Sequence, residues 1–317
     1  MNSAVNQAQG IIDISKIPSL PQTLIELIDK CNSKDRNLKE IGEVVARDVS
    51  ISARILQLAN SAFLGARNKF TDIEQAVIYR GVDTVRNLAI SVSVHETFSD
   101  IDKSGVLNIG TFWYHSFLTA VIAKTLSQEV RYPDQAKAYL TGLLHDVGKL
   151  LLFTSFPDDY PSILEQESNG DMLPILERGN LRVTHPEASS LLVSQWGLEQ
   201  SITDAVYSHH EDETELEEHD TLTKLLSIAN RFSNALMIDQ SPDGESSEKL
   251  LGIAPQNIPV IIQESKEEVD LITAEMGIHT TTDPLVRRKP SKQLHTNRAD
   301  LAKKVQAIST IGGVVDN

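Results

Sequence analysis

The sequence predicts an all-α protein built as two helical lobes. Runs that alternate apolar and polar residues, as half-buried strands do, are few in its 317 residues. Apolar residues instead recur at helical spacing along most of the chain, and residues that start or stop helices stand between these stretches. We therefore expect a lobe of short helices over residues 15–98, a second helical lobe over residues 106–240, and further helices over residues 241–278.

The first lobe is predicted to contain about five short helices. Asn37 followed by Glu40 is typical of a helix start, as is Thr71 followed by Glu74, and Gly81 is predicted to end the helix that Thr71 begins. The predicted buried faces lie at positions 20, 24, 27, 28 and 31; at 51, 55, 58 and 59; and at 85, 88, 89 and 92. Residues 99–110 contain Asp, Ser and Gly and are predicted to connect the lobes.

The second lobe is predicted to form around one central helix, residues 138–152. Apolar residues at 136, 140, 143, 144, 147 and 151 share one face there, and only His145 and Asp146 interrupt it. A helix over residues 111–130 precedes it, with His115 near its start. Prolines and glycines over residues 154–183 predict one or two short helices in an excursion over the core.

The remaining helices of this lobe carry more histidines. Thr184 and Glu187 form a predicted capping box, which puts His185 in the first turn of a helix that ends near Gly197. His209 shares an apolar face with Ile202, Ala205 and Val206, and His210 adjoins it.

The last third of the chain is predicted to mix helices with polar segments. Residues 211–220 hold seven acidic residues and are expected to form a solvated loop. A helix is predicted over residues 221–238 with Asn230 on its flank, followed by a loop at residues 242–247. Residues 1–14 are predicted to be an N-terminal extension, and residues 279–317 a polar flexible tail.

Composition narrows the class of protein. The net charge of −15 and the pI near 5.0 argue against a nucleic acid or an anionic membrane as the main partner. Cys31 is the only cysteine, so no disulfide can form within the chain and no Cys-rich zinc site is expected. The polar first ten residues lack a signal peptide's apolar core, and no apolar run approaches the roughly 18 residues that a membrane span needs. We expect a cytoplasmic protein.

Six polar residues stand on or beside apolar helical faces of the second lobe: His115, His145, Asp146, His185, His209 and His210. A buried carboxylate must be paired, hydrogen-bonded or bound to a metal. Imidazoles with a carboxylate suit a divalent transition metal such as iron, manganese, zinc, cobalt or nickel. Consecutive helical residues diverge by about 100°, so a metal shared by His145 and Asp146 would lie between their two directions. The alternative is a set of structural histidines in a module without metal.

The order of these residues resembles the HD superfamily of metal-dependent phosphohydrolases. The motif residues are His115, then GLLHDVGK over 142–149, then His185-Pro186-Glu187, then His209-His210. The first lobe is similar to the HDOD domain, the HD-related output domain of bacterial signalling proteins, through IPSLP at 17–21, VSISARILQLANSA at 49–62 and IEQAVIYRG at 73–81. This resemblance covers about residues 15–240 and implies the two-lobe HDOD architecture.

The resemblance implies roles for these residues. His115, His145 and Asp146 would bind one metal, and His185, His209 and His210 would hold a second where one is present. Lys149 matches a position that can meet a substrate or nucleotide phosphate, although a solvated lysine at a helix end is the alternative.

The sequence departs from the catalytic pattern at two places. A closing aspartate is expected on the helix over residues 221–238, where this chain has Asn230. The Gly-Tyr-Pro loop of the cyclic-dinucleotide phosphodiesterases is replaced by Glu211-Asp212-Glu213. A neutral amide in place of an anionic ligand weakens metal affinity and also the lowered pKa of the metal-bound water on which hydrolysis depends. Metal binding can therefore survive where turnover fails.

Three functions remain open. The leading hypothesis is a non-catalytic regulatory protein that binds other signalling proteins and holds a metal or a small nucleotide in a degenerate HD pocket. The second is a metal-dependent phosphohydrolase, in which the metal polarises the phosphate and generates hydroxide. The third is a binding module whose histidines are purely structural.

Overall fold

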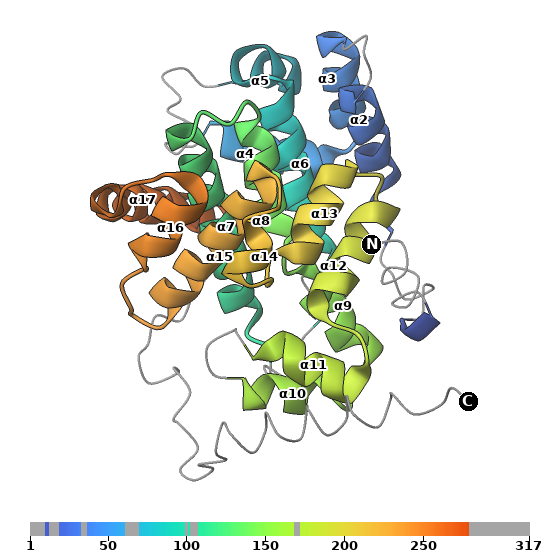
Figure 1. The fold of residues 1–317 in the computed structure, drawn as a ribbon. Helices are drawn as coiled ribbons and strands as arrows, with labels where there is room; N and C mark the ends of the chain where they lie inside the picture. The colour runs from blue at the N-terminus through green and yellow to red at the C-terminus, as the bar shows by residue number, and fades with distance from the viewer. Residues whose placement is uncertain are drawn as a thin grey trace, which may run out of the picture. The chain divides into compact units, whose positions relative to one another are not determined.

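Helices make up every secondary-structure element that the computed structural model describes, so the all-α prediction is confirmed (Figure 1). The described residues are 10–12, 19–32, 37–60, 70–98, 101, 107–167 and 172–278. Most of the predicted 1–14 extension, most of the 99–110 connection and all of the predicted 279–317 tail lie outside these ranges. None of the described helices combines the length and apolar character that crossing a bilayer requires.

The helices before residue 98 pack against one another and lie at the top of Figure 1. They are α2 (Gln22–Asn32), α3 (Leu38–Ala46), α4 (Val49–Ala59), α5 (Ile73–Arg80) and α6 (Val82–Thr97). The Asn37 side chain accepts hydrogen bonds from the backbone N–H groups of Lys39 and Glu40, which confirms the predicted cap of α3. At α5 the cap is Asp72, which bonds the N–H of Gln75, and not Thr71. Both residue types cap helices, so the sequence pattern leaves a one-residue ambiguity there.

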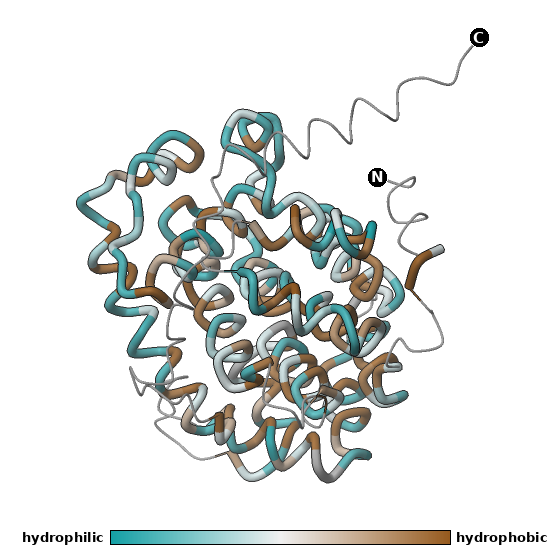
Figure 2. Tube along the Cα trace, turned by 90° about the horizontal axis from the view of Figure 1, so that it is seen from below, coloured by the Kyte–Doolittle hydropathy of each residue, from teal (hydrophilic) through white to brown (hydrophobic). Residues whose placement is uncertain are grey.

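The helices after residue 107 gather around the long helix α7 (Ile109–Glu129). The helices that pack most closely on α7 are α8 (Gln135–Leu144), α15 (Thr221–Met237) and α17 (Ile258–Met276). The others are α9 (Val147–Ser155), α10 (Tyr160–Gln166), α11 (Leu173–Leu181), α12 (His185–Gln195), α13 (Gln200–Ser208), α14 (Glu213–Leu216), α16 (Gly244–Leu251) and the 3₁₀ turn η3 (Pro255–Asn257). Hydrophobic and hydrophilic residues alternate along the helical parts of the trace, as amphipathic helices require (Figure 2).

The predicted central helix over residues 138–152 is two helices, which corrects the sequence-based expectation. α8 ends at Leu144 and α9 begins at Val147. Asp146 has φ −102° and ψ 1°, outside the helical region, and its carbonyl oxygen accepts from Lys149 N in a short turn. The apolar spacing continues through this break, so periodicity does not reveal it. As a result, the side chains of His145 and Asp146 reach the same cluster instead of diverging.

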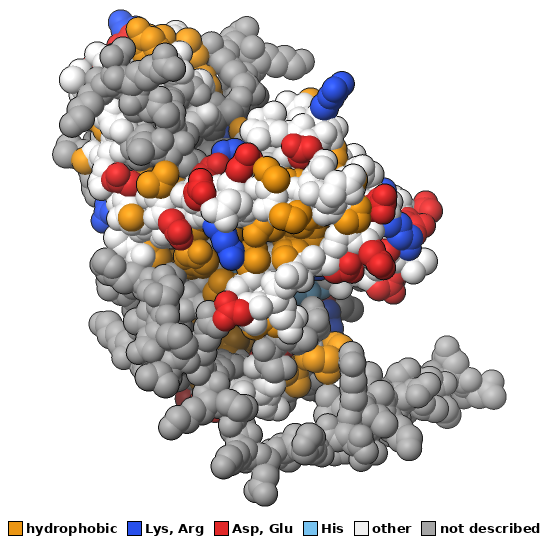
Figure 3. Space-filling view, turned by 90° about the vertical axis from the view of Figure 1, so that its left-hand side faces the viewer, with side chains coloured by type: hydrophobic (Ala, Val, Ile, Leu, Met, Phe, Trp, Pro, Cys, Tyr) orange, Lys and Arg blue, Asp and Glu red, His pale blue; other side chains and the backbone are white. Residues whose placement is uncertain are grey.

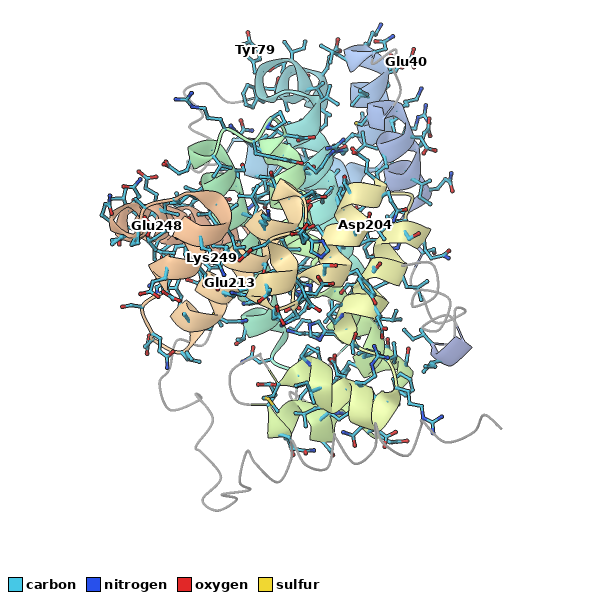
Figure 4. The ribbon with its side chains drawn as sticks, viewed as in Figure 1. Glu40, Tyr79, Asp204, Glu213, Glu248 and Lys249 are labelled. Carbon is cyan, nitrogen blue, oxygen red and sulfur yellow. The ribbon has the colours of Figure 1, made fainter. Side chains whose placement is uncertain are left out.

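Two predicted loops also contain helices. α14 lies within the acidic segment 211–220, because Asp212 caps it by accepting from the N–H groups of Thr214 and Glu215. α16 begins at Gly244, inside the predicted 242–247 loop, and Asp243 caps it. Lys249 of α16 pairs with Glu213 of α14 at 3.0 Å, so part of the acidic segment packs on a neighbouring helix (Figure 4).

Two glycines allow helices to approach closely beside the His145–Asp146 break. A Cβ at Gly142 would lie 2.6 Å from Ala120 Cα, where α8 crosses α7. A Cβ at Gly148 would lie 2.2 Å from the carbonyl oxygen of His185, where α9 crosses the start of α12. Gly148 N also donates to Ser189 Oγ at 2.7 Å. The absence of a side chain at position 148 therefore allows the first residue of α12 to lie against the start of α9.

We expect Gly148→Ala to lower the free energy of unfolding by about 3 kcal/mol, the upper end of the usual range for overpacking. The clash is with backbone, which a rotamer change cannot relieve. Thermal unfolding of the two proteins measures this effect. Gly179→Ala in α11 is the matched control, because no atom lies within 4 Å of its added Cβ. An equal melting temperature for Gly148→Ala and wild type would contradict the close approach.

Candidate metal centre

The six sequence-predicted ligand residues lie together in one cluster where helix ends meet. His115 is in α7, His145 and Asp146 form the break between α8 and α9, and His185 begins α12. His209 and His210 follow the last residue of α13. All except the partly exposed His210 are buried, and the confirmed Thr184–Glu187 capping box fixes the start of α12. The structure thus brings the six residues together, while their role as metal ligands stays a prediction.

Asp146 divides the cluster into two groups with ligand spacing, each with its candidate ligand atoms within 4.8 Å of one another. The Oδ2 half-site consists of Asp146, His115 and His145, with both Nε2 atoms 3.4 Å from Asp146 Oδ2. The Oδ1 half-site consists of Asp146, His185, His209 and His210. In it, Asp146 Oδ1 lies 3.3 Å from His185 Nε2 and 3.8 Å from His209 Nε2. One carboxylate therefore faces imidazoles on both sides.

Hydrogen bonds on the outer ring nitrogens orient the imidazoles. Nδ1 of His145 donates to the Gly142 carbonyl at 2.7 Å, and Nδ1 of His209 donates to the Val206 carbonyl at 2.6 Å. A carbonyl only accepts, so these bonds assign the proton to Nδ1 and leave a lone pair on Nε2, facing the cluster centre. This is how metal-binding histidines are usually held.

His115 and His185 are oriented by side chains. His115 Nδ1 lies 2.9 Å from Ser233 Oγ on α15. His185 Nδ1 lies 2.8 Å from Glu177 Oε2, which also accepts from the backbone N–H of His185 at 2.7 Å. The second oxygen of Glu177 accepts from the Tyr160 hydroxyl at 2.6 Å. Glu177 is completely buried and fixes both the ring and the backbone of His185.

Glu177 and Ser233 are the site residues that sequence reasoning missed. Glu177 falls in the Pro- and Gly-rich segment 154–183, for which the sequence predicts only an excursion over the core. A signal was present: Leu173, Glu177 and Leu181 are spaced four apart and all three are buried on one face of α11. An acid within an apolar helical stripe calls for a partner, as it did for Asp146.

Two buried atoms of the cluster have no hydrogen-bond partner among the described residues, namely His209 Nε2 and Asp146 Oδ1. The first carries a lone pair and the second carries negative charge, and they lie 3.8 Å apart. Leaving such groups buried and unpaired is costly, and a cation between them would satisfy both. Nitrogen donors with one carboxylate oxygen suit a divalent transition metal, so the residues present fit such an ion.

The protonation states of these groups favour binding of a cation. Burial lowers the pKa of four histidines of the cluster: His145, His185, His209 and His210. Their rings are therefore neutral at pH 7. Burial would raise the pKa of Asp146, but His145 and Lys149 outweigh it and hold that pKa well below its usual range. Burial raises the pKa of Glu177 to about 7.

We expect the metal-free protein to lose stability as the pH falls below about 6.5, the ordinary imidazole pKa. The four histidines take up protons on unfolding but not when folded, which favours the unfolded state in acid. Glu177 acts in the opposite direction, since its raised pKa favours the folded state as the pH falls from about 7 to 4.5. We expect the combined effect of the four histidines on stability to exceed the opposite effect of Glu177. Melting temperatures of chelator-treated protein from pH 7.5 to 5.5 measure this effect, and Glu177→Gln should steepen the fall. A flat profile would contradict it.

Asn230 lies on α15 beside the cluster. Its side chain is buried, and its Oδ1 has no hydrogen-bond partner in the described part of the chain. With His209 and His210 it lines a cavity of about 450 Å³, whose other lining residues include Arg231, Asn234 and Gln240. The predicted position of the closing acid is therefore beside the His/Asp cluster, and a neutral amide occupies it.

Lys149 turns toward the cluster. Its Nζ donates to Asp146 Oδ2 at 2.5 Å, and only 17% of the side chain is exposed. It is not among the residues that line the cavity. This contact differs from the alternative of a fully solvated lysine. The predicted contact between Lys149 and a ligand phosphate stays a prediction.

Comparison with known proteins identifies the family of this chain. Residues 17–212, more than half of the chain, match the family profile of the HDOD domain. The chain belongs to the HDOD domain family. The matched range lies within the 15–240 domain predicted from the sequence, and the outer boundaries of that HDOD domain stay predictions.

Solved structures share the HDOD fold. A proposed phosphohydrolase from Shewanella amazonensis SB2B aligns over 87% of this chain and 97% of its own, with TM-score 0.66 and 23% identity. An HDOD domain protein of unknown function from Geobacter sulfurreducens covers 87% and 93%, with TM-score 0.62 and 22% identity. A proposed signal transduction protein from Marinobacter aquaeolei VT8 covers 87% and 64%, with TM-score 0.67 and 20% identity. At these identities the likeness concerns the fold.

Curated relatives are longer than this HDOD chain. An uncharacterized protein from Treponema pallidum is 27% identical over 228 residues, which make up 70% of this chain and 43% of that protein. The uncharacterized protein YuxH from Bacillus subtilis is 25% identical over 126 residues, or 40% and 30% of the two chains. The chain thus spans less than half the length of either relative.

Proposed function

We propose that this HDOD protein is a cytoplasmic, non-catalytic signal-transduction protein that recognises other signalling proteins and binds a divalent transition metal in its His/Asp cluster. The family and the name of the Marinobacter protein support a signalling role. The net charge of −15 makes a protein partner more suitable than a nucleic acid, and Asp and Glu side chains are spread over the face in Figure 3.

Asn230 carries the non-catalytic part of the proposal. Among the described residues, the two groups with ligand spacing share one carboxylate, Asp146. Asn230 is buried beside His209 and His210 and adds no negative charge. Metal-assisted hydrolysis needs a metal that is held firmly while it polarises the phosphate and activates water. A cluster with one carboxylate for two half-sites is suited to binding an ion and poorly suited to turnover.

The cavity beside the cluster also supports binding of a small ligand. Asn230, Asn234 and Gln240 offer amide donors and acceptors. Glu211 and Asp212 offer carboxylates, and Arg231 brings a guanidinium that also donates to the Glu211 carbonyl oxygen. These groups match the hydrogen-bonding edges of a nucleobase. We infer that a nucleotide is the small ligand best suited to this cavity.

A phosphoester panel tests the proposal. We expect wild-type protein, shown by elemental analysis to carry metal, to give no turnover above background with cyclic dinucleotides, nucleotides or a generic phosphodiester. Asn230→Asp, which restores the acid, is the paired variant, and a gain of turnover in it would show that the amide disables the site. Turnover by the wild type that His145→Ala abolishes would overturn the proposal.

The second candidate is a metal-dependent phosphohydrolase. It is favoured by the arrangement of five histidines around Asp146, with the carboxylate facing both half-sites and a cavity at His209 and His210. The same panel separates the two candidates, because the second requires turnover by the wild-type protein.

A further inference from the structure

The two half-sites differ in how far this chain already satisfies them. In the Oδ2 half-site, Asp146 Oδ2 accepts from Lys149 Nζ at 2.5 Å. His115 Nε2 lies 3.2 Å from His145 Nε2, within hydrogen-bond distance, and Ser233 Oγ lies 2.9 Å from His115 Nδ1. Each ligand atom on this side thus has a partner from the chain itself.

The Oδ1 half-site is satisfied only in part, because His185 Nε2 and His210 Nε2 lie 3.1 Å apart while two other atoms stay unpaired. Asp146 Oδ1 and His209 Nε2 are buried and have no hydrogen-bond partner among the described residues. Both belong to this half-site and neither belongs to the other. The unmet demand for a cation is therefore on one side of Asp146.

The number and quality of the donors point the same way. The Oδ1 half-site offers three imidazoles and a carboxylate oxygen, against two imidazoles and an oxygen already held by an ammonium. Behind His185 stands the carboxyl group of Glu177, at 2.8 Å from Nδ1. A carboxylate behind a metal-bound imidazole raises its basicity and strengthens binding.

The two half-sites also differ in their access to the cavity and in the charge next to them. The cavity is lined by His209 and His210 but by neither His115 nor His145, so an ion and its free coordination positions would face open space only on the Oδ1 side. Lys149 places a positive charge on Oδ2, and a divalent ion on the same oxygen would meet electrostatic repulsion. The acid that would offset this repulsion is replaced by Asn230.

We propose that the cluster binds one divalent transition metal, in the Oδ1 half-site, and that the ammonium of Lys149 stands in for a second ion at Oδ2. The inference rests on the metal-binding part of the proposed function and adds the stoichiometry, the half-site and the residue that sets them.

Cobalt binding to the full chain tests this. Chelator-treated protein is titrated with Co²⁺, and bound cobalt is measured by elemental analysis after desalting and by visible absorption. We expect one equivalent for wild type. His185→Ala should lose tight binding and the absorption band, whereas His115→Ala should keep one equivalent with a band close to that of wild type. Circular dichroism checks that each variant is folded.

Lys149 variants test the stand-in role. Lys149→Met removes the ammonium and should raise the bound cobalt to two equivalents, while Lys149→Arg keeps the positive charge and should leave one. If Lys149→Met does not fold, Lys149→Gln carries the same expectation. A folded neutral variant that still binds one equivalent would overturn the role of Lys149.

Other outcomes separate the two proposals. Two equivalents in wild type, or cobalt lost in His115→Ala and kept in His185→Ala, would overturn the assignment to the Oδ1 half-site while metal binding stands. Folded wild type that binds no cobalt would overturn the metal-binding part of the proposed function, and this inference with it.

Discussion

Asp146→Asn is expected to lower the affinity of the cluster for Co²⁺ by about 100-fold or more. Loss of an outer partner of a metal ligand typically costs 10–100-fold, and Asp146 is a candidate ligand itself. Asp146 is also the one carboxylate that both groups share. Its removal leaves neutral imidazoles, because burial lowers the pKa of His185 and His209 and keeps these rings uncharged.

A competition titration against a chromophoric chelator measures this change. Asn has nearly the same shape as Asp, so circular dichroism should show a folded chain. Asp158→Asn makes the same carboxyl-to-amide change at an exposed position in the turn before α10 and should bind Co²⁺ like wild type. If Asp146→Asn binds Co²⁺ within about threefold of wild type, a metal centre at this cluster is excluded.

The six cluster residues could be predicted from the sequence because each is a polar residue on or beside an apolar helical stripe. His145 and Asp146 interrupt a face made of Leu143, Leu144 and Val147, all of which are buried. A buried charge needs a partner, and the other histidines of the second lobe, on or beside apolar faces, are suitable ones. The sequence therefore predicts which residues meet but not the distances between them.

What could not be predicted depends on backbone geometry and on contacts distant in the sequence. The break at His145–Asp146 is invisible to periodicity, because the apolar spacing on its two sides stays in phase. The short helix α14 forms in an acidic run because Asp212 caps it and Lys249 pairs with Glu213 from α16. The division of the imidazoles between the two oxygens of Asp146, and the contact of Lys149 with Oδ2, depend on three-dimensional positions that a sequence pattern does not carry.

Glu177→Ala is expected to destabilise the protein by about 3 kcal/mol or more and to weaken Co²⁺ binding by roughly 10–100-fold. The carboxyl group accepts from the Tyr160 hydroxyl, His185 N and His185 Nδ1 at 2.6, 2.7 and 2.8 Å. Removing it leaves three buried donors without their acceptor, and each unsatisfied group costs about 1–3 kcal/mol. His185 would also lose the contact that fixes its tautomer.

Thermal unfolding and Co²⁺ titration of the same samples separate the two effects. Glu177→Gln can still accept through its amide oxygen but brings an amide NH₂ group toward donors, so both effects should be intermediate. Glu165→Ala, an exposed glutamate in α10, should leave both quantities unchanged. A loss of stability with unchanged cobalt affinity would make Glu177 a support of α11 and α12 alone. Glu177→Gln can also lose more cobalt affinity than its loss of stability accounts for. That result would show that the carboxylate acts on the ion through His185.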